Sequence, residues 1–167
     1  NNLLGFDDKL NFQYQLAHES SYFLKNIRYL FPIGLRMQLG ALAGFSRVKL
    51  GEELLDLDVR GKSRVYGLFA NYSLIKKASL RVDLNCGFDY KDVWNYQTGE
   101  LTSNDRLRVV KTGFESDFTD SFGRTIFTYE LDCGISDTMG GMEDKDADAS
   151  RLGAGGKFIK HNLNLLR

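Results

Sequence analysis

Three aspartates in the segment EDKDADAS have the spacing of the first ligands of a calcium-binding loop. Asp144, Asp146 and Asp148 alternate along the chain, as the first carboxylate ligands of such a loop do. The position that requires glycine is occupied by Ala149, however, and the position that requires a bidentate glutamate is occupied by Gly155. We therefore expect a solvated surface loop here, and we predict no metal and no other cofactor.

Other residues that could support catalysis are few and scattered. A hydrolase needs a nucleophile and a base within hydrogen-bond reach, and the two histidines are His18, in a predicted loop, and His161, in a predicted strand. The segment GAGGK lacks the hydroxyl residue and the full spacing of a phosphate-binding loop. Cys86 and Cys133 fall in apolar rows without a C-x-x-C motif, so we expect small apolar side chains, with a disulfide or a reactive thiol as the alternatives. We predict that the chain is not an enzyme.

Composition points to a β-rich chain without a nucleic-acid partner. The 167 residues include 22 basic and 22 acidic residues, so there is no net charge to attract a polyanion. The 17 glycines, 12 phenylalanines and 8 tyrosines beside a single proline suit strands joined by Gly, Asn and Asp turns. No stretch approaches the roughly 20 consecutive apolar residues of a membrane helix.

The segment SLRVDLNCGFDYKD, residues 79–92, shows the clearest periodicity. Its apolar residues recur at every second position and its polar residues fill the positions between them, which only an extended strand sorts onto two faces. Strands of globular proteins have a modal length of about 5 to 6 residues, whereas a tilted strand that crosses a bilayer needs roughly 9 to 11. This segment meets the longer requirement.

The same pattern recurs along the chain and predicts eight strands. We place them at residues 9–17, 22–31, 35–46, 64–74, 79–92, 108–118, 125–136 and 153–165. Pro32 and Gly34 are expected to end the second strand in a tight turn. The last strand is ambiguous in phase, because Phe158 lies on one side while Ile159 and Leu163 lie on the other.

The connections between the predicted strands alternate in length. FPIG, LIKKA and TDSFG are short, whereas residues 48–62, 93–105 and 137–150 are long, polar and charged. Outer-membrane barrels pair short periplasmic turns with long external loops in this way. Together with the long strands, this alternation predicts an all-β fold, an antiparallel transmembrane β-barrel of the outer-membrane type with about eight strands in this chain.

In such a barrel the apolar rows face lipid and the polar rows face a water-filled lumen. We therefore predict that the residues facing the lumen include Arg36, Gln38, Arg81, Asp83, Asn85, Asp89, Glu130 and Asp132. These inward residues carry charges of both signs.

Several strings resemble the haemolysin secretion/activation proteins, the outer-membrane translocators of two-partner secretion. They are NNLLGFDDKLNFQYQ, VYGLFANYSLIKKASLRVDLNCGFDYKD, DFTDSFGRTIFTYELDCGISD and GKFIKHNLNLLR, which look like successive turns and strands of the family's barrel. Arg124 and His161 depart from the family's glycine and apolar residue, and the family's V-R-G-Y loop motif does not occur in this sequence.

The resemblance implies that residues 1–167 are a single segment, the N-terminal half of a sixteen-stranded barrel, without the periplasmic POTRA domain. It further implies localisation in the outer membrane of a Gram-negative cell, porin activity, and a large haemolysin- or adhesin-type exoprotein as the secreted partner. The alternative is a small barrel in which the eight strands close on themselves and which has a structural or surface-binding role.

Overall fold

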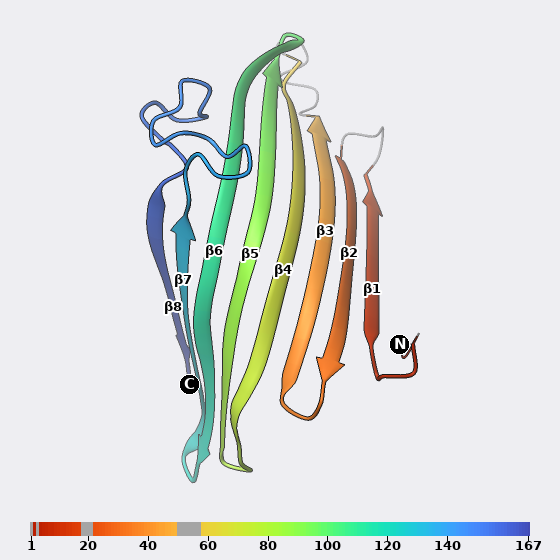
Figure 1. Cartoon of the computed structure of the whole chain (residues 1–167), viewed down its shortest axis with the longest axis vertical. Coiled ribbons are helices and arrows are strands. Elements are labelled where there is room, and N and C mark those ends of the chain that lie inside the picture. The colour runs from red at the N-terminus through yellow and green to blue at the C-terminus, as the bar shows by residue number, and fades with distance from the viewer. Residues whose placement is uncertain (1, 3, 18–21, 50–57) are drawn as a thin grey trace.

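The computed structural model describes residues 2, 4–17, 22–49 and 58–167. Eight strands form one antiparallel sheet in the order of the sequence (Figure 1). Their bounds are β1 Lys9–Leu16, β2 Tyr22–Ile33, β3 Met37–Lys49, β4 Arg60–Lys76, β5 Leu80–Gln97, β6 Glu100–Asp120, β7 Gly123–Gly134 and β8 Phe158–Leu166. The all-β prediction and the predicted number of strands are confirmed. In the described ranges no helix is long and apolar enough to cross a membrane.

The sheet encloses almost no apolar core. Among the described residues, the buried hydrophobic side chains are Val109 and Met142, whereas large apolar side chains are exposed on every strand except β7, where they are half-buried. Leu68, for example, is 66% exposed in the middle of β4. Exposed apolar patches of this extent normally mark a surface that is covered by a partner or by lipid.

The strand register separates an apolar face from a polar face. Leu84 of β5 pairs with Tyr72 of β4 and with Phe114 of β6, so the three apolar side chains form one row across the sheet. The next residue, Asn85, pairs with Asn71 and Gly113 on the opposite face. Adjacent strands thus keep the same parity across the sheet, except at the register shifts after Ser73 of β4 and between Asn95 and Tyr96 of β5.

The predicted connection at residues 93–105 is wrong. Strands β5 and β6 continue through it and are joined by a hairpin at Thr98 and Gly99, whose φ angles of 52° and 85° suit a tight two-residue turn.

The predicted end of the second strand is also wrong, because Pro32 lies within β2 and pairs with Gln38. The chain turns after Ile33, where Gly34 adopts a positive φ of 65°.

The last strand has a defined phase in the structure. Ile159 and Leu163 pair with Cys133 and Tyr129, so they belong to the apolar face, whereas Phe158 pairs with Gly134 on the polar face. Strand β8 begins at Phe158 and not at the predicted residue 153, because residues 135–157 form one long irregular connection.

The sheet is open. Within the described part of the chain, β1 pairs with β2 and β8 pairs with β7, and neither edge strand has a second neighbour (Figure 1). The eight strands therefore do not close on themselves, which was the alternative that the sequence left open.

Candidate functional site

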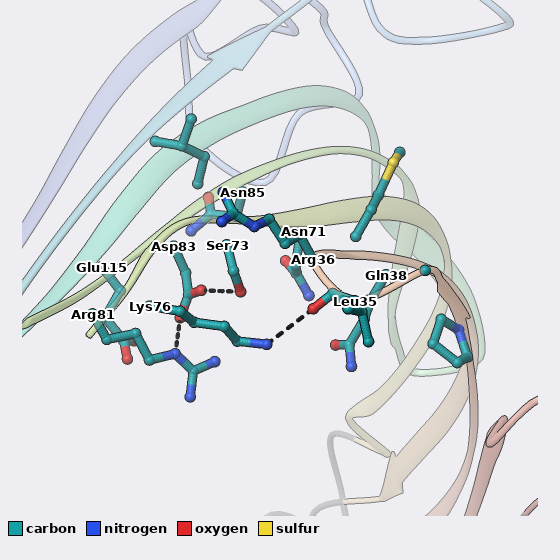
Figure 2. Close-up of a pocket in the computed structure, with 14 residues that line it drawn as sticks. Leu35, Arg36, Gln38, Asn71, Ser73, Lys76, Arg81, Asp83, Asn85 and Glu115 are labelled. Atoms are coloured by element: carbon teal, nitrogen blue, oxygen red, sulfur yellow. Dashed lines mark hydrogen bonds and ion pairs between the residues drawn. The ribbon is translucent and has the colours of Figure 1, made fainter. Parts of the chain in front are cut away.

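A polar pocket of about 310 Å³ lies on the polar face near the short turns. Figure 2 shows the sheet curving around this pocket, with side chains from β3, β4 and β5 and from the turn before β3 pointing into it. Asp83 organises the pocket: it accepts a hydrogen bond from the Ser73 hydroxyl at 2.6 Å and pairs with Arg81 Nε at 2.5 Å. Lys76 Nζ donates to the backbone carbonyl oxygen of Leu35 at 3.0 Å, which ties β4 to the neighbouring turn.

A second set of polar contacts crosses the middle of the same face. Lys111 Nζ lies 2.9 Å from Asp89 Oδ2, and the Asn162 amide donates to Glu130 at 3.3 Å and to Asp132 at 3.1 Å. These contacts join side chains from four different strands, β5 to β8. Asp89, Glu130 and Asp132 are thus neutralised or hydrogen-bonded locally.

The eight residues predicted to face a lumen share this face. The register places Gln38, Asn85 and Glu130 in one row, while Arg81 and Asp83 lie nearer the short turns. The remaining three, Arg36, Asp89 and Asp132, are distributed along the same face. The backbone carbonyl oxygen of Arg36 accepts a hydrogen bond from the Ser73 amide. That this face lines a water-filled lumen stays a prediction.

Several residues of this face are not among the eight that were predicted to face a lumen. They are Arg28, Ser73, Lys111, Glu115 and Asn162, which line the pockets or contact the predicted residues. The signal that identifies them is their parity within each strand. Their partners depend on the register between strands, which the pattern within one strand does not contain.

A charged network on the apolar face was also missed. Asp92 is 3% exposed and accepts from Arg108 at 3.0 Å and from Arg64 at 2.9 Å. The Arg108 guanidinium is 1% exposed, stacks over the Tyr90 ring with 3.3 Å to its centroid, and donates to the carbonyl oxygen of Met139 at 3.2 Å. This network marks the end of the apolar rows nearest the long connections.

The connection at residues 135–157 is ordered against the free edge of β6. Backbone amides of Ile135 and Met142 donate to the carbonyl oxygens of Arg108 and Arg106, both at 2.8 Å. Asp146 pairs with Arg106 at 3.1 Å. A hydrogen bond from the Asp148 amide lowers the pKa of the Asp146 carboxyl group. Desolvation opposes this shift, and the nearby Arg106 lowers the pKa further.

In the described part of the chain, no group of three or more His, Cys, Asp or Glu side chains could hold a metal ion.

The chain has been compared with known proteins. CdiB from Escherichia coli, a solved structure, superposes with a TM-score of 0.81 over 99% of this chain and 32% of CdiB, at 16% sequence identity. The chain has the fold of part of the CdiB barrel. It spans about a third of the length of CdiB. No protein-family model matches the sequence, and no curated protein matches it.

The superposition agrees with the open sheet. A piece of a larger barrel has two edges that its own strands do not pair, as β1 and β8 do here. It also has one apolar and one polar face, as the register shows. At this level of identity the similarity concerns the fold.

Proposed function

We propose that this chain is part of an outer-membrane translocator of two-partner secretion, which exports a large unfolded protein from the periplasm to the cell surface without catalysing a reaction. The observation that carries the proposal is the two-faced open sheet, which superposes on part of CdiB, a translocator of this kind. Residues 1–167 then form the N-terminal half of a sixteen-stranded barrel.

The dimensions of the apolar face support placement in a membrane. The apolar row from Leu80 to Tyr90 extends about 34 Å at about 3.4 Å per residue. At a strand tilt of about 40°, this corresponds to about 26 Å along the membrane normal, close to the roughly 25 Å apolar band of outer-membrane barrels. Aromatic side chains at both ends of this band suit the two interfaces, since Phe118 pairs with Leu80 and Tyr66 pairs with Tyr90.

The open edges require further strands. In lipid, each unpaired backbone N–H or C=O group costs several kcal/mol, so exposed strand edges do not occur in the hydrocarbon region. Strands β1 and β8 each present one such edge in the described sheet. Additional strands of the same protein would close the barrel and enclose the polar face.

The polar face suits the passage of an unfolded polypeptide. It mixes basic side chains, among them Arg36 and Lys111, with acidic ones, among them Asp83 and Glu130. Fixed charges of one sign would hold an oppositely charged segment tightly, whereas a mixed surface keeps a moving chain hydrated with weak contacts.

Deletion of the gene for the full-length parent protein tests this proposal. We expect a large exoprotein to remain in the periplasm of the deletion strain, and we expect the purified parent protein to form a water-filled channel in planar bilayers. Unchanged secretion in the deletion strain together with no conductance of the purified protein would contradict the proposal.

A further inference from the structure

The apolar face becomes basic beyond the row that contains Tyr90. The next row across β2 to β5 contains Lys25, Phe45, Arg64 and Asp92, and the row after it contains Phe23, Arg47, Lys62 and Trp94. All these side chains have the parity of the apolar face. Four cations and three aromatic rings therefore gather on the outer surface, beside the ends of β2 to β5 that point toward the long connections.

These side chains line a groove of about 540 Å³, which we call the basic groove. Its walls are formed by Lys25, Arg47, Lys62 and Arg64 with the rings of Phe45 and Trp94, and among the described residues no acidic side chain lines it. Arg64 is paired with Asp92 at 2.9 Å. Within the described residues, Lys25, Arg47 and Lys62 have no ion pair with a carboxylate.

Aromatic rings hold the cations in place. Lys25 Nζ lies 5.1 Å from the centroid of the Phe23 ring, and Lys62 Nζ lies 4.8 Å from that of Tyr96. The Arg64 guanidinium lies 5.1 Å from the Trp94 ring. A cation held over a ring keeps N–H donors available for an anion, and the ring adjoins the apolar chains of a lipid.

The position of the groove selects the kind of anion. The apolar band ends at Tyr90, and the first of the two basic rows contains Asp92, two residues further along β5. Two residues correspond to about 7 Å along the strand. With the long connections outside the cell, as the alternation of connection lengths predicts, this is the depth of the outer-leaflet headgroups. We propose that the basic groove binds the phosphate groups of a phosphorylated outer-leaflet glycolipid of the lipid A type. This inference rests on the proposed function for the membrane placement.

Lipid retention by the full-length parent protein tests the inference. The protein is purified in detergent, mixed with lipid A, and bound lipid is measured by native mass spectrometry. In the test variant, Lys25, Arg47 and Lys62 are each replaced by Gln. The matched control replaces Lys145, Arg151 and Lys157 by Gln, which removes the same charge from the exposed connection between β7 and β8.

We expect the test variant to bind lipid A on the order of a hundredfold more weakly than the wild type, because each basic side chain near an anionic lipid surface contributes about fivefold. The control variant should bind like the wild type. A charge-conserving variant, with Lys25→Arg, Arg47→Lys and Lys62→Arg, should keep most of the binding. Heat-modifiable gel mobility shows whether each variant is folded.

Equal retention by the folded test variant and the wild type would overturn the inference, as would an equal loss in the control. Binding of dephosphorylated lipid A as strong as that of lipid A, or displacement of lipid A by an equal concentration of inorganic phosphate, would also overturn it. These outcomes differ from failure of the proposed function. A parent protein that inserts and conducts but shows no phosphate-dependent retention contradicts the groove alone, whereas one that does not enter the outer membrane contradicts the function.

Discussion

Asp92 and Arg108 are buried charged residues where the apolar rows of the sheet end. Burial of either charge alone would be costly, and their contact at 3.0 Å, with Arg64 as a second partner of Asp92, offsets that cost. The Met139 carbonyl oxygen from the connection between β7 and β8 accepts a further hydrogen bond from Arg108. The network therefore limits how far the apolar surface extends toward the long connections.

The parity of neighbouring residues predicts opposite effects of the same substitution. Leu84 is 40% exposed on the apolar face, so Leu84→Arg should cost about 2 to 4 kcal/mol if this face lies at mid-membrane. Asn85→Arg places the charge on the polar face, beside the pocket, and should be tolerated. Assembly of the two full-length variants can be scored by heat-modifiable gel mobility. Equal assembly would contradict the assignment of the apolar face to lipid.

At the scale of strands, the sequence predicts the number of strands and the two faces of the sheet correctly, but it predicts the ends of several strands wrongly. Alternation depends only on the chain itself, so the row from Leu80 to Tyr90 is readable in advance. The hairpin at Thr98 and Gly99 was missed because the polar residues flanking it read as a loop, although they extend β5 and β6. Contacts such as Lys111 with Asp89 depend on register, which alternation leaves open.

The strand connections predict which end of the sheet lies outside the cell. Cysteines introduced at Gln97 and Lys145, both exposed near the long connections, should react with an impermeant maleimide on intact cells. One introduced at Ser121, in the turn between β6 and β7, should not react. The experiment requires full-length protein without Cys86 and Cys133, which are free in the structure. Labelling at Ser121 alone would invert the proposed topology.

The connection between β7 and β8 should be held by Asp146. Because the pKa of this carboxyl group is lowered, its contribution is complete at neutral pH and is lost only as pH falls through that lowered value. Asp146→Asn should therefore speed exchange of the Met142 amide at pH 7 by about two- to fivefold, the effect of losing one surface ion pair. Hydrogen exchange measures this effect. Asp144→Asn, at an exposed site with only a 3.8 Å contact to Lys157, is the control.

At the scale of the whole molecule, the sheet combines three surfaces with different requirements. In the proposed function, its apolar face contacts lipid, its two edges pair with further strands, and its polar face contacts water. A closed barrel larger than eight strands satisfies all three, because closure pairs the edges and encloses the polar face at the same time.

The polar face predicts how the channel should respond to the loss of a single charge. Asp83 is 20% exposed and already pairs with Arg81 and Ser73, so Asp83→Asn removes one negative charge and leaves Arg81 without its partner. We expect the channel of the full-length variant to shift toward anion selectivity, measured as a changed reversal potential in a salt gradient across a planar bilayer.

Secretion of the exoprotein should remain largely intact in the same variant, because a mixed surface offers a moving polypeptide many weak contacts and no single binding site. Neutralisation of Asp117, which pairs with Arg124 beside the turn between β6 and β7, provides a comparison at the end of a strand. An abrupt loss of secretion on Asp83→Asn with normal assembly would show that one inward charge does bind the exported chain, and the account of passage by weak contacts would have to be replaced.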